Sequence, residues 1–372
     1  MKKRIAIVLL LALAVSIAIY FVSKDAINAL TKGKTNPPDI SAANAIVIEL
    51  NSGMVLYEKK AEEKAYPASI TKILTALVAL ENENLDKIVK VSDSAVGVEG
   101  SSIYLEKGEK IPLRDLIYGM MLRSGNDAAV AIAADVGGSI DNFACMMNDR
   151  AKEIGAVNSH FVNPNGLQNE NHYTTARDMA MIAREAMKNK EFRKIASAKS
   201  WTSDRGEGKY NYFANKNKVV YQYDGGNGIK IGYTKAAGRT LVASSKRDGM
   251  ELICVVLNAP DWFNDTYKLM DYFYDKYQLV KIAEGERLIN SVKIVEGTKD
   301  FAYIGTKENV VCPSLKDKEC KISIAYDVQK SRKAPVSRWQ KAGKLNVYCD
   351  GEYIYSEPLY YLEDIERGRN SE

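Results

Sequence analysis

At 372 residues the chain is long enough for two or three domains, and its composition is that of a globular protein without a bias toward disorder. The formal net charge of +5 is modest and spread along the chain, which excludes the concentrated basic surface of a nucleic-acid-binding protein and suits contact with an anionic envelope. No Cys-x-x-Cys pair or Cys/His cluster has metal-ligand spacing, so we expect neither a metal nor a cofactor.

The chain begins with an export or anchoring segment. Three basic residues at positions 2–4 precede an apolar run from Ile5 to Val22. This pattern is typical of a cleaved signal peptide or of a single membrane anchor, and the length of the run leaves both open. Residues 1–22 therefore predict that the rest of the chain lies outside the cytoplasm, bound to the membrane if the segment is retained. The polar residues 23–42 predict a tether.

The stretch Pro67-Ala-Ser-Ile-Thr-Lys72 opens an apolar helix that we expect to end near Asn82. Ser69 and Lys72 lie one turn apart on the same side of this helix. A lysine in the first turn is disfavoured by the helix dipole, and the same field favours the neutral amine that a general base requires. A serine beside a neutral lysine is an activated nucleophile. The alternative is a helix cap, with Ser69 as N-cap and Lys72 as a solvated charge.

A second polar pair lies where two apolar helices meet. Pro112 opens a helix that runs to about Leu122, and another helix resumes at Asp127. The intervening corner holds Ser124 and Asn126 against the core. The alternative is a simple helix break with Asn126 or Asp127 as the cap.

The remaining pattern predicts an α+β fold. Strands are expected at 45–50, 54–57, 229–234, 240–245 and 251–257, and further helices at 140–154, after the capping residue Thr175, and at 266–277. Strands at both ends with helices between them indicate an antiparallel sheet with helices packed on it, over residues 43–278. Residues 279–362 show short strands without helical periodicity and predict a small all-β domain, followed by a charged tail at 363–372.

The cysteines and histidines receive structural interpretations. Cys145 and Cys254 fall in apolar periodic segments and are expected to be buried. Cys312 and Cys320 flank a polar loop and can form a disulfide in an exported protein. Both histidines, His160 and His172, are interpreted as surface or loop residues.

Three short motifs occur in the order Ser69-Ile-Thr-Lys72, Ser124-Gly-Asn126 and Lys230-Ile-Gly232. This ordered set resembles that of the penicillin-binding proteins and β-lactamases. The sequence segments around these motifs resemble one branch of that group, the low-molecular-weight D-alanyl-D-alanine carboxypeptidases. The matching segments are Tyr66–Lys72, Leu122–Ala129, Asn163–Leu167 and Ala237–Ser244. The resemblance covers roughly residues 43–278, and more loosely the β domain. It implies a β-lactamase/transpeptidase-like fold for the first domain.

The resemblance implies acyl transfer on the D-Ala-D-Ala end of peptidoglycan stem peptides. Ser69 would attack the penultimate D-Ala carbonyl, Lys72 would accept the serine proton, and Ser124 would relay it to the leaving D-alanine nitrogen. Water would then hydrolyse the acyl-enzyme. Penicillins, which mimic the D-Ala-D-Ala end, would acylate Ser69 as inhibitors.

The same resemblance implies the substrate-binding residues. Asn126 would hold the substrate amide and help to position Lys72. Lys230 would supply positive charge for the substrate carboxylate and help to keep Lys72 neutral. Beside Gly232, the backbone N–H groups of Ser69 and Tyr233 would form an oxyanion hole, whose loss typically costs roughly 10²–10³ in rate.

One position departs from the family pattern. Ile231 stands where relatives usually carry the threonine or serine whose hydroxyl contacts the substrate carboxylate. A hydrogen bond to a charged group contributes roughly 1.5–3 kcal/mol, so we expect about ten- to a hundred-fold weaker carboxylate engagement unless Thr234 compensates.

This departure keeps two alternatives open. The first is a cell-wall binding or scaffold protein of the same fold with weakened catalysis. The second is a β-lactamase, although we find no Glu-x-x-x-Asn element between Asn126 and Lys230 to activate a deacylating water.

Overall fold

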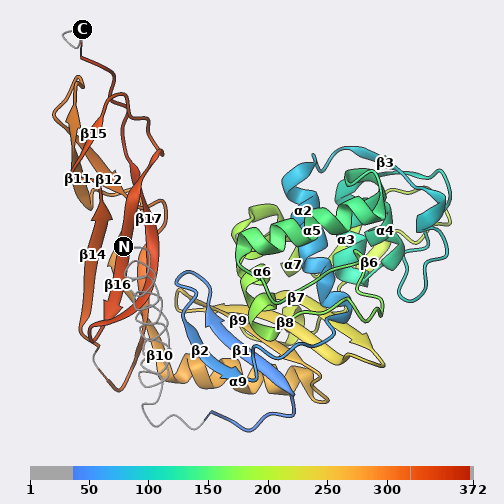
Figure 1. Ribbon diagram of the computed structural model, residues 1–372. Coiled ribbons are helices and arrows are strands. Elements are labelled where there is room, and N and C mark those ends of the chain that lie inside the picture. The colour runs from blue at the N-terminus through green and yellow to red at the C-terminus, as the bar shows by residue number, and fades with distance from the viewer. Residues whose placement is uncertain (1–36, 319, 369–372) are drawn as a thin grey trace, which may run out of the picture. The chain divides into compact units, whose positions relative to one another are not determined.

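The computed structural model describes residues 37–318 and 320–368, and the chain divides into two compact units (Figure 1). The first unit is Pro38–Asp275, and the second takes in the chain from Lys276 onward. Each unit has a hydrophobic core of its own. The predicted export segment, most of the predicted tether and the last four residues of the predicted tail lie outside the described residues.

An antiparallel five-stranded sheet with the order β2-β1-β9-β8-β7 forms the centre of the first unit. Its strands are β1 (Asn44–Glu49), β2 (Val55–Lys59), β7 (Gly226–Thr234), β8 (Gly238–Arg247) and β9 (Met250–Leu257). An Asp-Gly turn joins β8 to β9, and Asp248 and Gly249 both have the positive φ that a tight hairpin turn requires. Two short pairs lie outside this sheet: β3 (Ile88–Lys90) with β4 (Lys110–Pro112), and β5 (Ser200–Thr202) with β6 (Tyr212–Ala214).

Helices pack on both faces of the sheet, which confirms the predicted α+β class. Figure 1 shows α9 on one face and α2 to α7 on the other. The helices are η1 (Ala68–Thr71), α2 (Lys72–Asn82), η2 (Asp93–Ala95), α3 (Leu113–Arg123), α4 (Asn126–Val136), α5 (Ile140–Ile154), α6 (Ala176–Lys188), α7 (Lys190–Ser197), α8 (Val219–Gln222) and α9 (Trp262–Lys276). As predicted, Thr175 caps α6 by accepting a hydrogen bond from the backbone N–H of Asp178. The α-helices α7 and α8 and the short 3₁₀ helix η2 were not predicted.

Helix α2 lies inside the helical layer and is buried on every side. All its residues from Lys72 to Ala79 are buried, although the sequence pattern predicts only one buried face. It packs against α4, α5 and α6 as well as against η1. A helix that is apolar all round needs such surroundings, because any exposed face would leave apolar side chains in water. The first residue of this helix is therefore removed from solvent.

The second unit is all-β, as predicted. Its six-stranded sheet has the order β14-β16-β17-β12-β11-β15, and β10 pairs separately with β13. The strands are β10 (Tyr277–Ala283), β11 (Asn290–Val295), β12 (Phe301–Gly305), β13 (Val310–Leu315), β14 (Ile322–Val328), β15 (Ser331–Lys333), β16 (Lys341–Cys349) and β17 (Glu352–Tyr361). Its core includes Val292, Ile304, Leu345 and Leu359.

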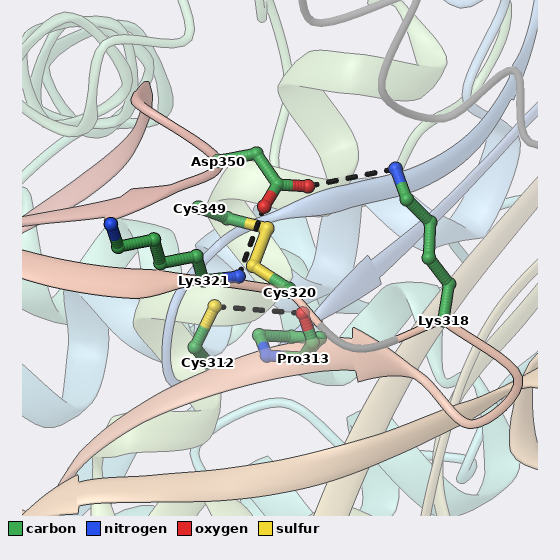
Figure 2. The surroundings of a disulfide bond; sticks show 7 residues. All are labelled: Cys312, Pro313, Lys318, Cys320, Lys321, Cys349 and Asp350. Carbon is green, nitrogen blue, oxygen red and sulfur yellow. Dashed lines mark hydrogen bonds and ion pairs between the residues drawn. A yellow bond between two sulfur atoms is a disulfide. The ribbon is translucent and has the colours of Figure 1, made fainter.

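Two of the cysteine predictions are wrong. The disulfide joins Cys320 to Cys349, and Cys312 is buried within β13 instead (Figure 2). Strand register decides the pairing: the chain entering β14 runs beside the end of β16, where Lys321 and Asp350 exchange hydrogen bonds of 2.9 and 3.0 Å. Cys145 is exposed on α5, whereas Cys254 is buried as predicted. Cys320, Cys349 and Asp350 also form a group with metal-ligand chemistry, but the disulfide occupies both sulfur atoms.

Within the described residues, no single helix has both the length and the apolar character needed to cross a membrane, although the bent pair α4 and α5, which meet at 88°, satisfies both criteria jointly.

Candidate active site

Ser69 lies in η1, and its backbone is enclosed by two glycines. A Cβ added at Gly166 would lie 1.9 Å from the carbonyl oxygen of Ala68, and one added at Gly232 would lie 2.8 Å from the Ser69 nitrogen. Only glycine allows both approaches. The Ser69 side chain makes no helix-capping hydrogen bond, so the interpretation of Ser69 as an N-cap is wrong.

Lys72 Nζ sits among three oxygen atoms. It lies 2.9 Å from Ser69 Oγ, 2.7 Å from Asn126 Oδ1 and 2.6 Å from the backbone carbonyl oxygen of Asn165. The last two atoms can only accept hydrogen bonds, so they take both N–H groups of a neutral amine. The amine lone pair is then directed at the Ser69 hydroxyl, which is the arrangement that a serine-activating base requires.

Burial favours the neutral amine of Lys72. Desolvation is the largest effect that lowers the pKa of Lys72 far below its usual value, and the nearby positive charge of Lys230 lowers it further. The residue pattern attributed this effect to the helix dipole, and the family resemblance added the charge of Lys230; neither included burial. The interpretation of Lys72 as a solvated charge is wrong, because the side chain is fully buried at the start of α2.

Ser124 and Lys230 form the second polar pair of the site. Ser124 adopts a left-handed backbone with φ of 64° at the break between α3 and α4, which turns its buried side chain toward β7. Lys230 Nζ donates to Ser124 Oγ at 3.1 Å and to the Ile231 carbonyl oxygen at 3.0 Å. Two effects lower the pKa of Lys230 to about 7: the larger is burial of the side chain, and the smaller is the positive charge of Lys216.

Asn126 joins this corner to the base. Its Oδ1 accepts from Lys72, and its Nδ2 donates to the Glu99 carbonyl oxygen at 2.6 Å. The next residue, Asp127, anchors the corner because its carboxylate accepts from the backbone N–H groups of Ile103 and Leu105. Asp127 is therefore a buried anchor of the corner as well as the first acidic residue of α4.

The edge strand β7 brings Lys230, Gly232 and Tyr233 to the site. Gly232 pairs with Thr240 of β8, whose hydroxyl donates to the Pro67 carbonyl oxygen at 3.0 Å and so holds β8 against the segment that precedes Ser69. Tyr233 follows with an exposed side chain. The strand thus runs alongside the Ser69 N–H group, at the position where the resemblance expects an oxyanion hole.

Ile231 brings no hydroxyl to this strand, and the Thr234 hydroxyl has its hydrogen still available. Thr234 Oγ1 accepts a hydrogen bond from the Ala237 N–H at 3.0 Å within the β7–β8 turn. The Ile231 side chain is partly buried, and only its carbonyl oxygen takes part in the site, through Lys230.

Sequence reasoning missed three contributors to the site. The Asn165 carbonyl is a backbone atom, which no residue-type pattern can identify. Lys216 adds positive charge near Lys230, and nothing in its surface loop distinguishes it in the sequence. His172 is buried rather than on the surface, and its Nε2 lies 2.8 Å from the hydroxyl of Thr71, the residue before Lys72.

Comparison with known proteins shows which family the chain belongs to. Residues 31–261 match the family profile described as D-alanyl-D-alanine carboxypeptidase, peptidase family S11. The chain belongs to this family. It is accordingly a carboxypeptidase of the serine-peptidase class and a penicillin-binding protein. Residues 277–367 match a second profile, the C-terminal domain of penicillin-binding protein 5, which corresponds to the all-β unit.

Curated relatives and solved structures of this carboxypeptidase family are similar to this chain over most of its length. The D-alanyl-D-alanine carboxypeptidase DacF of Bacillus subtilis is 32% identical over 336 residues, covering 88% of this chain and 86% of its own. DacC of Escherichia coli is 30% identical and covers 89% of this chain and 86% of its own. The crystal structure of penicillin-binding protein 5 from Haemophilus influenzae matches with a TM-score of 0.71 at 28% identity, covering 90% of this chain and all of that one.

Proposed function

We propose that this carboxypeptidase removes the terminal D-alanine from peptidoglycan stem peptides through an acyl-enzyme formed on Ser69. The observation that carries the proposal is the geometry of Lys72: a buried amine whose N–H groups are both engaged by Asn126 and Asn165 and whose lone pair faces Ser69 Oγ at 2.9 Å.

Acylation begins with proton transfer from the Ser69 hydroxyl to Lys72 Nζ as Oγ attacks the penultimate D-Ala carbonyl. The carbonyl oxygen becomes an oxyanion beside the backbone N–H groups of Ser69 and Tyr233. The fixed closeness of Gly232 to the Ser69 nitrogen supports this role, because donors that are already in position cost no rearrangement during the reaction.

Departure of D-alanine requires a proton on its nitrogen. Ser124 is the donor we propose, because its hydroxyl accepts from Lys230 and so has its own hydrogen available to the substrate. Lys72, protonated in the first step, returns its proton through Ser124. When water attacks the acyl-enzyme, Lys72 accepts a proton from the water and donates it to Ser69 Oγ as the ester bond breaks, so both side chains return to their starting states.

Replacing Ile231 tests whether this chain is an active enzyme or a catalytically weakened scaffold protein. Lys230 remains as a cation for the terminal carboxylate, but the hydroxyl beside it is missing. We expect Ile231→Thr to raise kcat/KM for D-alanine release about ten- to a hundred-fold, chiefly through KM. No gain in the threonine variant would show that this chain binds the carboxylate by other means.

We also infer that the protein works outside the cytoplasm at the membrane or cell wall. The basic and apolar character of residues 1–22 supports export or anchoring. Peptidoglycan substrates and β-lactam inhibitors are met on that side of the membrane.

The direct test is mass spectrometry of the protein after incubation with penicillin. We expect one added penicillin mass that maps to Ser69 and is absent from Ser69→Ala. Ser94→Ala, which alters an exposed serine of η2, is the matched control and should label like the wild type. D-Alanine release from a D-Ala-D-Ala peptide should follow the same pattern. An adduct that persists in Ser69→Ala would refute the assignment.

A further inference from the structure

A cavity opens beside the turn that joins β7 to β8, and the mechanism above leaves it unused. Its volume is about 420 Å³. It is lined by Tyr233, Gly238, Arg239, Asn258, Pro260 and Trp262. A cation, an amide and two aromatic rings therefore surround a space large enough for a side chain or a short piece of peptide.

The register of β7 and β8 relates this cavity to the nucleophile. Tyr233 and Arg239 are direct cross-strand partners, so their side chains share one face of the sheet. The preceding pair, Gly232 and Thr240, faces the opposite side, where it contacts the segment around Ser69. The cavity thus lies one residue further along β7 than the position that touches Ser69, on the face that carries α9.

Arg239 gives the cavity a charge that the protein leaves uncompensated. Its guanidinium donates one hydrogen bond of 2.6 Å, to the Pro260 carbonyl oxygen, and its Cζ lies 5.9 Å from the centre of the Trp262 ring. Among the described residues, no carboxylate lies within ion-pair distance of Arg239. Arg247 at the other end of β8, in contrast, pairs with Asp224 and Asp271. An exposed guanidinium with most of its donors available is suited to bind a carboxylate from outside the protein.

The proposed reaction fixes which part of the substrate reaches this cavity. The leaving nitrogen must approach Ser124, which is bonded to Lys230, so the terminal D-alanine lies on the Lys230 side of Ser69. The acyl-donor part of the peptide must then extend the other way along β7, past Tyr233 and toward the turn. The Arg239 cavity is at that end.

We propose that this cavity is a subsite for a carboxylate carried by the acyl-donor part of the substrate, on the N-terminal side of the scissile bond, with Arg239 as the residue that binds it. The Trp262 ring and the Pro260 carbonyl oxygen hold the guanidinium in place. This inference rests on the proposed function. It makes Arg239 a specificity-determining residue for acidic peptides, separate from Lys230, which faces the terminal carboxylate.

The test compares matched peptides on the full chain. Two acetylated pairs, acetyl-Glu-Ala-D-Ala-D-Ala against its Gln counterpart and acetyl-Ala-Glu-D-Ala-D-Ala against its Gln counterpart, differ only in one charge before the scissile bond. We expect the wild type to prefer Glu at one of these positions by about five- to thirty-fold in kcat/KM. The preference should shrink as salt rises, because Arg239 is exposed.

Variants assign this preference to the cavity. Arg239→Gln should reduce the Glu/Gln ratio to below about twofold, and Arg239→Lys should retain part of it, because the charge remains while the planar fork is lost. Lys235→Gln removes an exposed charge from the same turn, outside the cavity lining, and should keep the wild-type ratio. The penicillin adduct on Ser69 verifies that each variant is folded.

Two results would overturn the inference: no preference for Glu at either position in the wild type, or an unchanged preference in Arg239→Gln. Both are distinct from failure of the proposed function, which would abolish D-alanine release from all four peptides and the Ser69 adduct together. Arg239→Gln could also release no D-alanine from either member of a pair. In that case the Glu/Gln ratio of kcat/KM in Arg239→Lys decides, and a ratio equal to that of the wild type counts against the subsite.

Discussion

In the proposed mechanism, Lys72 can act as a base because of what its two N–H groups bind. An ammonium beside Ser69 would only donate to the hydroxyl, whereas a neutral amine that is bound to Asn126 and Asn165 offers its lone pair. Neither acceptor carries a formal charge. A carboxylate at either position would stabilise the ammonium and remove the base at neutral pH.

Asn126→Asp tests this account. The new carboxylate would stand 2.7 Å from Nζ and raise the pKa of Lys72, because a negative charge stabilises the ammonium form. Because acylation needs the neutral amine, the acidic limb of its pH profile should move to higher pH by the same amount. The measurement is the second-order rate of penicillin acylation from pH 5 to 10.

Asn126→Ala is the control for the preceding variant, since it removes both contacts of the amide without adding charge. It should slow acylation without moving the acidic limb upward. An acidic limb that stays in place in Asn126→Asp would contradict the assignment of Lys72 as the base.

Lys230→Met should stabilise the protein while impairing catalysis. The pKa of Lys230 is about 7 in the folded protein, and its ordinary value of 10.5 applies to the unfolded chain. Between pH 7 and pH 10.5 the unfolded chain therefore binds one more proton than the folded protein. The free energy of unfolding therefore decreases as the pH drops from about 10.5 to 7, and it remains at the lower value at more acidic pH. Methionine removes this cost. We expect a gain on the order of 2 kcal/mol at pH 6 that disappears near pH 10.5, measured by urea denaturation. A gain that grows with pH would refute the argument.

At the scale of elements, two buried side chains fasten loops to the catalytic helices. Asp127 at the start of α4 accepts from the N–H groups of Ile103 and Leu105 and from the Ser102 hydroxyl. His172 connects η1, which precedes α2, with the loop at Val162. Both are buried and lie next to residues of the proposed site, since His172 contacts Thr71 before Lys72 and Asp127 follows Asn126.

Asp127→Asn should destabilise the first unit. The amide is nearly isosteric, but its nitrogen would face N–H donors in a site where the carboxylate accepts from several. We expect a loss of about 2 kcal/mol in the free energy of unfolding, measured by urea denaturation. Asp141→Asn on the exposed start of α5 is the matched control and should change stability by less than about 0.5 kcal/mol. Equal stability of Asp127→Asn and the wild type would contradict an anchoring role.

His172→Phe should slow the reaction without unfolding the protein. The Val162 N–H donates to His172 Nδ1 at 3.2 Å, so Nε2 carries the hydrogen and donates to the Thr71 hydroxyl at 2.8 Å. Phenylalanine keeps the ring against Phe161 but loses both bonds. Because Thr71 precedes Lys72, we expect a displaced amine and a roughly 10- to 100-fold lower kcat.

The chain's other histidine provides the control for this prediction. His160 is exposed, and His160→Phe should leave kcat near the wild-type value. If His172→Phe retains full kcat, the contact with Thr71 does not position Lys72.

Residue types and periodicity predict much of this site, and backbone geometry accounts for what they miss. Ser69, Lys72, Ser124, Asn126 and Lys230 stand in short motifs whose side chains carry the chemistry, and the structure brings them together. The Asn165 carbonyl could not be predicted, because every residue has a carbonyl and only the fold selects one.

The errors in the sequence predictions have the same physical origin. The Cys320–Cys349 bond depends on the register of β14 against β16, whereas Cys312 is nearer to Cys320 in sequence but belongs to another strand pair. Cys145 occupies a helical position next to the buried stripe of α5, where apolar periodicity cannot distinguish an edge from a core position.

At the scale of the whole molecule, the described residues of the two units form separate hydrophobic cores that share no residues. The catalytic groups all belong to the first unit, and the disulfide belongs to the second. The stability of the second unit and the chemistry of the first should therefore respond independently to mutation.

The double variant Cys320→Ser, Cys349→Ser tests this independence in the full chain. The cysteines are 29 residues apart, and a crosslink over that length stabilises a fold by about 3–4 kcal/mol in the chain-entropy description. We expect the second unit to unfold at lower denaturant concentration, as followed by loss of hydrogen-exchange protection in β14 and β16. Penicillin acylation of Ser69 should persist to the wild-type denaturant concentration, and Cys145→Ser, at an exposed position of the first unit, should alter neither. If acylation were lost together with protection of β14, the two units would unfold as one, and the active site would depend on the second core.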